Sequence, residues 1–352
     1  MFEESRSDKS RDMQGSVLIT GGAGYIGSHI CKALVRAGYR PITYDNLVHG
    51  HQWAVRWGPL ETGDVLDKTK LAHVFDRYRP LAVVHCAAFA YVGESMSNPE
   101  KYYQNNVAGS LSLLQVARRD LTPIVFSSSC ATYGIPDRLP ITECTPQQPI
   151  NPYGATKLMV ERMIADFGQA YRLPFATLRY FNVGGADADG EIGEDHTPET
   201  HLIPLVIDAA SGRGPPITIF GTDYDTPDGT CIRDYIHVSD LADAHVRAVQ
   251  RLLAGGSSDA FNLGIGRGFS VREVVASVER VTGRMVPVIM SSRRPGDPPA
   301  LVSDAAKARK ELGWKAAYDE LDALIRTAWT WHQTHFSSDR ETPIVVAKSR
   351  RT

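Results

Sequence analysis

Tyr153 and Lys157 are the first residues whose types and spacing suggest chemistry, and they lie in the stretch NPYGATKLMVE at 151–161. Asn151 and Pro152 favour a helix start, because Asn caps free backbone N–H groups and Pro fits the first turn. Residues four apart on a helix share a face, so Tyr153 and Lys157 would lie side by side. A neighbouring cation favours the phenolate of tyrosine, whose pKa is ordinarily about 10, and could make it a usable base. The same letters also fit a helix start without any chemistry, so the rest of the chain must decide.

A serine upstream could join this pair. The run SSSCATYG at 127–134 places Ser129 at the end of a predicted strand. Ligands of open α/β sheets bind at the carboxyl ends of the strands, where a hydroxyl can hydrogen-bond a reacting oxygen. Serines at a strand end are also common turn residues, so Ser129 is a candidate only in combination with Tyr153 and Lys157.

A glycine-rich turn near the start predicts a dinucleotide site. The stretch VLITGGAGYIGSHI places Gly21, Gly24 and Gly27 between a β-branched run and a helix. Glycines there allow a tight turn and a close approach of the backbone to a pyrophosphate, which the helix N-terminus attracts. Asp45 ends the next predicted strand, where its carboxylate can accept a hydrogen bond from a ribose 2′-hydroxyl and would repel a 2′-phosphate. The unit therefore predicts NAD rather than NADP.

Two further polar residues can each be interpreted in two ways from the sequence around them. Asp64 follows another predicted strand end and could contact the adenine ring, but it could equally be a surface acid. Asn105 lies in a predicted helix and could be a buried, hydrogen-bonded core residue as readily as a site residue.

The elements that must position these residues alternate between strands and helices. The helical stretch HICKALVRAG follows the first strand, and the predicted strands are SVLIT (16–20), RPITYD (40–45), LAVVHCAA (81–88), PIVFSSS (123–129) and FATLRYFNV (175–183). Strands separated by helices indicate βαβ units and a parallel sheet covered on both faces. The predicted fold class is α/β, a Rossmann-type doubly wound parallel sheet with a smaller α/β substrate-binding domain.

The amino-acid composition of the chain changes after Asn182. Gly, Pro, Asp and Glu crowd 184–200 and 212–230 around a short predicted helix HLIPLVIDAAS, and the segment 233–253 returns to a strand followed by a helix. The predicted division is a disordered extension at 1–14, an NAD-binding domain at 15–182 and 231–256, a substrate-binding domain at 183–230 and 257–335, and a tail at 336–352.

Composition narrows the class of protein. The formal charge of −2 over 352 residues gives no general electrostatic attraction for nucleic acid or an anionic membrane. No run of about twenty apolar residues occurs, and the charged start lacks the apolar core of a signal peptide. The five cysteines are scattered without metal-ligand spacing, so we expect buried thiols in a reducing compartment, no metal, and a cytoplasmic protein.

Several motifs together resemble one family. TGGAGYIG, SSSCATYG and YGATK are similar to the extended short-chain dehydrogenases/reductases. The stretches YVGESMSNPEKYYQNNV, RYFNVGGA, FGTDYDTPDGTCIRDYIHVSDLADAH, NLGIGRGFSV and RRPGDPPA resemble the UDP-glucose 4-epimerase branch, and the resemblance covers about residues 16–332.

The resemblance implies roles for residues of this chain. Tyr153 would take the proton of the sugar 4-hydroxyl, Lys157 would hold the nicotinamide ribose and polarise Tyr153, and Ser129 would hydrogen-bond the 4-oxygen. The residues expected around NAD are Gly21, Gly24, Tyr25, Ile26, Gly27, Asp45, Asn46, Asp64, Val65, Asn105 and Lys157. The residues expected around the UDP-sugar are Ser129, Tyr153, Asn182, His201, Leu202, Phe220, Arg233, Arg294, Asp297 and Leu301. The family chemistry is reversible C4 epimerisation of UDP-glucose and UDP-galactose through a 4-keto sugar, and relatives are commonly homodimers.

Three positions depart from the family pattern. Ala90 stands where many relatives carry a lysine near the cofactor, and His201 stands where an asparagine is common. Leu301 occupies a position where a tyrosine accompanies plain hexoses and a small residue accompanies N-acetyl sugars. The preferred sugar is therefore open between hexoses, N-acetylhexosamines, pentoses and uronates.

Two other classes of function compete. A dehydratase on the same scaffold usually has an Asp-Glu pair directly after the strand-end hydroxyl, whereas Cys130 and Ala131 follow Ser129 here. A non-catalytic NAD-binding regulator would be expected to lack the tyrosine or the lysine, and this chain has both.

Overall fold

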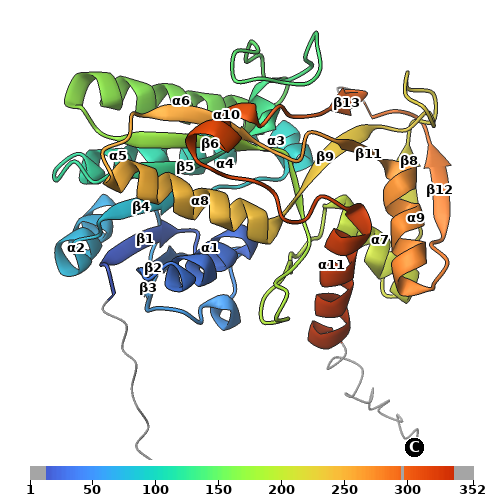
Figure 1. Ribbon diagram of the computed structural model, residues 1–352, viewed down its shortest axis with the longest axis horizontal. Coiled ribbons are helices and arrows are strands. Elements are labelled where there is room, and N and C mark those ends of the chain that lie inside the picture. The colour runs from blue at the N-terminus through green and yellow to red at the C-terminus, as the bar shows by residue number, and fades with distance from the viewer. Residues whose placement is uncertain (1–12, 295–296, 337–352) are drawn as a thin grey trace, which may run out of the picture.

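A seven-stranded parallel sheet forms the centre of the protein, in a computed structural model that describes residues 13–294 and 297–336 (Figure 1). Its strand order is β10-β6-β5-β4-β1-β2-β3. The strands are β1 (Ser16–Thr20), β2 (Arg40–Asp45), β3 (Leu60–Thr62), β4 (Ala82–His85), β5 (Ile124–Ser129), β6 (Phe175–Tyr180) and β10 (Asp259–Leu263). Every residue of β4 and β5 is buried, as expected for parallel strands covered on both faces.

Helices cover both faces of this sheet. On one face, α1 (Tyr25–Arg36), α8 (Val238–Leu253) and α10 (Ala306–Glu311) share a core that includes Ile30, Leu241 and Trp314. On the other face, α2 (Lys68–Tyr78), α5 (Gly109–Ala117) and α6 (Pro152–Tyr171) enclose a core that includes Leu71 and Phe126. The shorter helices of this unit are η1 (Gln52–Ala54), α3 (Val92–Ser97), α4 (Pro99–Tyr102), the π-helix η2 (Tyr103–Ala108) and η3 (Cys130–Thr132).

A smaller unit lies beyond the carboxyl ends of the large sheet, at the right of Figure 1. It contains a four-stranded sheet of β7 (Asn182–Gly184), β9 (Ile232–His237), β11 (Gly268–Ser270) and β13 (Ala300–Leu301), and a parallel pair of β8 (Ile217–Phe220) and β12 (Val288–Ser291). The helices α7 (Leu202–Ser211), α9 (Val271–Thr282) and α11 (Leu321–His335) pack around a separate core that includes Val206 and Ile325.

The alternation of strands and helices predicted from the sequence is confirmed for the first 180 residues. The first helix begins at Tyr25, four residues before the predicted stretch, because the glycine turn leads directly into it. The helix at Pro152 begins as predicted, since the Asn151 side chain accepts a hydrogen bond from the Gly154 N–H at 2.8 Å.

Two strands do not lie in the domain to which the predicted division of the chain assigned them. β10 was expected in the smaller domain, but it pairs with β6 at the edge of the large sheet, where Phe261 and Leu263 are fully buried. β9 was expected in the NAD-binding domain, but it joins the four-stranded sheet, while α8, which follows it directly, packs against α1. The chain therefore crosses between the units more often than its composition indicates. The predicted 1–14 extension and 336–352 tail fall almost wholly outside the described residues.

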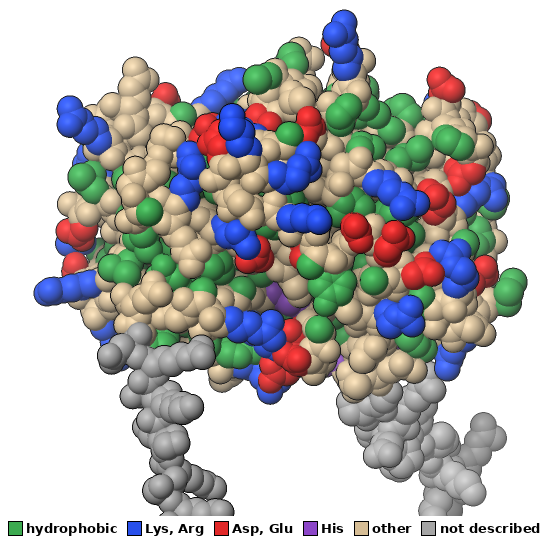
Figure 2. Space-filling view, viewed as in Figure 1, with side chains coloured by type: hydrophobic (Ala, Val, Ile, Leu, Met, Phe, Trp, Pro, Cys, Tyr) green, Lys and Arg blue, Asp and Glu red, His purple; other side chains and the backbone are tan. Residues whose placement is uncertain are grey.

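The surface matches the near-neutral composition. On the face shown in Figure 2, positive and negative side chains are interspersed rather than segregated. Among the described residues, no helix combines the length and apolar character needed to cross a membrane.

Candidate active site

The glycine turn between β1 and α1 forms a cradle that has no room for a side chain at Gly21 or Gly27. Gly21 has a φ of +75°, and a Cβ on Gly27 would lie 2.1 Å from the Gly21 carbonyl oxygen. No side chain in the described part of the chain caps the first turn of α1, and its N-terminal N–H groups face a cleft that Gly21, Gly24 and Gly27 line. This geometry fits the pyrophosphate of a dinucleotide.

Asp45 lies at the edge of this cradle, held by two backbone donors. Its carboxylate accepts hydrogen bonds from the N–H groups of Ala23 at 3.0 Å and Leu47 at 2.8 Å. Burial raises the pKa of Asp45, while the two N–H groups act in the opposite direction. A fixed acceptor at the end of β2 fits a ribose hydroxyl, so the residues present suit NAD.

The other predicted cofactor residues divide into two groups. Tyr25, Ile26, Asn46, Val65 and Asn105 line the cleft, which has a volume of about 450 Å³. Asp64 does not line it; its side chain accepts hydrogen bonds from Asn46 Nδ2 at 2.9 Å and from the Leu66 N–H at 2.8 Å.

Tyr153, Lys157 and Ser129 meet in the wall of the same cleft. Tyr153 and Lys157 lie one turn apart on α6, and the Lys157 ammonium is 5.9 Å from the centre of the Tyr153 ring. Lys157 Nζ donates to the Ser127 carbonyl at 2.7 Å. Ser129 lies at the end of β5, where its Oγ accepts from the Ala131 N–H at 3.1 Å and the hydroxyl also hydrogen-bonds Tyr153.

Burial dominates the titration of this pair. It raises the pKa of Tyr153 to about 12, against a lowering by the hydrogen bond with Ser129. It lowers the pKa of Lys157 to about 8, against the effects of Cys86 and Glu161. The expected lowering of the Tyr153 pKa by Lys157 is absent, since burial, Ser129 and Cys130 are the effects on the phenol, while the Lys157 ammonium is engaged by the Ser127 carbonyl.

Residues of the smaller unit close the cleft from the opposite side. Asn182, Arg233, Asp297 and Leu301 line it, together with His201 and Leu202 at the start of α7. Arg233 is held by the carbonyls of Ile232 at 2.8 Å and Pro298 at 2.9 Å, and lies 3.6 Å from Asp297.

Phe220 and Arg294 lie outside the lining of the cleft but next to each other. The Arg294 guanidinium stacks 4.7 Å from the centre of the Phe220 ring and pairs with Asp297 at 3.0 Å. Both side chains are exposed. This pair, termed the outer step below, is linked to the cleft by the ion pair between Arg294 and the cleft residue Asp297.

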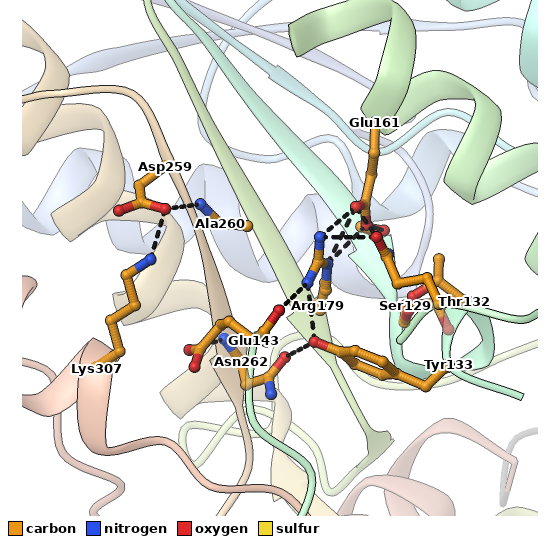
Figure 3. Close-up of polar contacts among 12 residues, drawn as sticks. Ser129, Thr132, Tyr133, Glu143, Glu161, Arg179, Asp259, Ala260, Asn262 and Lys307 are labelled. Carbon is orange, nitrogen blue, oxygen red and sulfur yellow. Dashed lines mark hydrogen bonds and ion pairs between the residues drawn. The ribbon is translucent and has the colours of Figure 1, made fainter. Parts of the chain in front are cut away.

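A buried polar network around Arg179 and Glu161 holds α6 against the large sheet (Figure 3). Glu161, one turn beyond Lys157, pairs with Arg179 of β6 at 2.6 Å and accepts a hydrogen bond from Ser128 of β5. Arg179 also donates to the Tyr133 hydroxyl at 2.9 Å, and that hydroxyl donates to Asn262 at 2.7 Å. The network ties α6 to three strands of the large sheet, β5, β6 and β10.

Known proteins resemble this chain over most of its length. Residues 17–264 match the model of the NAD dependent epimerase/dehydratase family. A UDP-glucose 4-epimerase of Rhizobium leguminosarum bv. trifolii is 53% identical over 318 residues, which cover 90% of this chain and 97% of that protein. The crystal structure of UDP-glucose 4-epimerase from Brucella ovis in complex with NAD has 57% identity and a TM-score of 0.88, covering 90% of this chain and 97% of that one. The chain belongs to the UDP-glucose 4-epimerase family.

The name of a further relative includes a second sugar, GlcNAc. The UDP-Glc/GlcNAc 4-epimerase from Campylobacter jejuni has 39% identity and a TM-score of 0.80, covering 91% of this chain and 99% of that one. Position 301, where this sequence departs from the family pattern, lies in the wall of the cleft. Leu301 is buried against Tyr133 and Phe181, so the leucine contributes to a packed wall.

Other cleft residues of this epimerase-family chain were not predicted from its sequence. They include Cys86, Phe89, Tyr180, Phe181, Glu194 and His196. Glu194 and His196 belong to the segment 184–200, which the composition indicated only as a loop. The alternation of acids and histidines in EDHTPETH was the signal that could have identified them.

Proposed function

We propose that this protein interconverts UDP-glucose and UDP-galactose by reversible epimerisation at C4, with tightly bound NAD. The observation that carries this proposal is the convergence of Tyr153, Ser129 and Lys157 with the glycine cradle and Arg233 in one cleft of about 450 Å³. NAD, when bound, supplies a hydride acceptor in the first half of the reaction and a hydride donor in the second.

The side chains divide the work of the reaction. Tyr153 removes the proton of the sugar 4-hydroxyl as the C4–H bond breaks, and it returns a proton to the 4-oxygen after the 4-keto sugar has turned over. Ser129 hydrogen-bonds the same oxygen and so steadies the charge that develops there. Lys157 orients the nicotinamide ribose through hydrogen bonds from its ammonium group.

Binding of the nucleotide is assigned to the smaller unit. Arg233 pairs with the diphosphate, because a guanidinium offers parallel donors to phosphate oxygens. Arg294 joins it from the outer step, Phe220 stacks against the uracil, and Asp297 orients both arginines. Asn182 and Leu202 position the sugar and the diphosphate. Leu301 faces the sugar, and Asp64 acts on the cofactor side indirectly, through Asn46.

A turnover assay without added cofactor tests the proposal. Purified protein given UDP-galactose should form UDP-glucose, because NAD is regenerated in each cycle. A parallel panel of UDP-N-acetylglucosamine, UDP-xylose and UDP-glucuronate identifies the preferred sugar. No product from any of these sugars, with bound NAD confirmed after denaturation, would refute epimerisation.

We also propose that the enzyme acts as a cytoplasmic homodimer in galactose metabolism. Three large apolar side chains, Met96, Tyr103 and Met159, are exposed on the adjoining elements α3, η2 and α6. An apolar patch on neighbouring helices favours burial against a second copy. Sedimentation equilibrium tests the dimer, and a monomer at all micromolar concentrations would contradict it.

A further inference from the structure

Four titratable side chains form a cluster in the segment between β7 and α7. Glu194, His196, Glu199 and His201 bring one carboxylate oxygen or ring nitrogen each to within 4.8 Å of one another. His201 Nδ1 lies 2.6 Å from Glu194 and 3.4 Å from Glu199. His196 Nδ1 lies 3.3 Å from Glu194 and 3.6 Å from Glu199. Each imidazole therefore directs the same nitrogen at the same two carboxylates.

The geometry fixes the direction of the His201 ring. Its Nδ1 is engaged by Glu194, and its backbone N–H donates to Glu199 at 2.8 Å. Its side chain is 43% exposed and lines the cleft, whereas Glu194 is buried behind it. With Nδ1 engaged on the buried side, Nε2–H is the donor that the ring can offer to a ligand.

The surroundings also fix the charge of this ring. The partial burial of the ring by itself would lower the pKa of His201, but Glu194 and Glu199 raise it to about 10. The same carboxylates raise the pKa of His196 to about 9 against the effect of burial. Tyr25 of α1 and Tyr91 before α3 also pack on His196, with ring centres 6.4 and 6.1 Å away, and His49 and Asp195 interact with it electrostatically. Two imidazolium ions thus balance two carboxylates.

We propose that Glu194 and Glu199 are positioning residues that hold His201 as a cation on the cleft wall, where its Nε2–H binds the diphosphate of the nucleotide sugar. This inference rests on the proposed function, because the diphosphate is the anionic part of a UDP-sugar. His201 directly precedes the first residue of α7, and no side chain of the described residues caps that helix, so its N-terminal dipole favours an anion at the same place. Arg233 supplies a second cation on the cleft.

A charged imidazole at this position has a consequence for pH dependence. Because its pKa is raised to about 10, the ring should keep its charge through the range in which an ordinary histidine loses it, so binding of the diphosphate should not weaken there. Removing the charge of Glu194 or Glu199 should lower the pKa of His201, so that the ring loses its proton near neutral pH.

Histidine NMR of the NAD-loaded protein tests the charge directly. The His201 ring signal, identified by its loss in His201→Asn, should not titrate from about pH 6 to about pH 9. In Glu194→Gln, which keeps the shape but removes the charge, the signal should titrate within that range. A wild-type signal that titrates near the ordinary histidine pKa would overturn the proposal, whatever the variants do.

Binding and kinetics test the role. Glu194→Gln should raise the KM for UDP-galactose and the Kd for UDP about tenfold above neutral pH, the equivalent of one charge-assisted hydrogen bond, with kcat within about twofold. Asp195→Asn is the matched control, since Asp195 is the neighbouring carboxylate but pairs with His335 rather than His201. Its KM should match that of the wild type and stay independent of pH.

The outcomes that contradict the proposal are distinct. Unchanged KM and Kd in Glu194→Gln would overturn it, as would a fall in kcat with unchanged KM. A stoichiometric divalent metal in the purified protein, with UDP binding lost on EDTA treatment, would show that the cluster is a metal site instead. If Glu194→Gln does not fold, Glu199→Gln gives the same comparison. UDP binding measured by calorimetry is independent of turnover, so it separates failure of this inference from failure of the proposed epimerisation.

Discussion

Tyr153 shows how far single residues can be interpreted from their spacing. The four-residue interval to Lys157 predicted two side chains on one helix face, and both line the cleft. The interval did not predict that the same burial would raise the pKa of the phenol to about 12 and lower that of the ammonium to about 8. Local spacing places side chains relative to each other, whereas their desolvation depends on segments far away in the sequence, so it required the structure.

If Tyr153 transfers the proton, its hydroxyl should be needed for turnover but not for holding NAD. Tyr153→Phe should therefore lower kcat by about 10²–10⁴-fold, the range for loss of a general acid–base group, and leave NAD bound. Tyr171→Phe, at an exposed tyrosine at the end of the same helix, should leave kcat unchanged. Steady-state rates and NAD content after denaturation measure both effects, and a Tyr153→Phe rate close to that of the wild type would remove Tyr153 from the mechanism.

The helix α6 illustrates what an element contributes to the site. Asn151 and Pro152 start it, and this local signal was visible in the sequence. Its anchorage was not, because Glu161 meets Arg179 on β6, eighteen residues later, and that pairing depends on the register of the sheet. No pattern within a helix predicts an ion pair between a helix and a strand beneath it.

Breaking this anchor should destabilise the protein and displace Tyr153 and Lys157 on the same helix. Arg179→Met leaves the buried Glu161 carboxylate without its cation, which should cost about 3–5 kcal/mol in the free energy of unfolding. The double variant Glu161→Gln/Arg179→Met removes both charges and should recover part of that loss. Urea unfolding measures these changes, and an Arg179→Met variant as stable as the wild type would show that the pair does not anchor α6.

At the scale of the whole molecule, the cleft lies between two units that the chain enters repeatedly. Most of the parallel sheet was predictable because its strands are short and apolar and alternate with helical segments. The return of β10 to that sheet was not, since DAFNL carries no signal of which sheet it will join and pairs with a strand about eighty residues earlier. The gathering of Ser129, Tyr153, Asn182, Arg233 and Leu301 in one cleft likewise follows from the crossings between the units.

Because both units line the cleft, a nucleotide bound there should stabilise them together. UDP at about 100 times its Kd should add about 2.7 kcal/mol to the free energy of unfolding of the NAD-loaded protein, and it should raise Tm by several degrees in one transition. Arg233→Met should remove most of this shift, since Arg233 is the cleft arginine assigned to the diphosphate. Arg119→Met, at an exposed arginine paired with Asp76, should keep the shift. Scanning calorimetry at a fixed scan rate measures it, and two separate transitions with only one displaced by UDP would mean that the nucleotide does not bridge the two units.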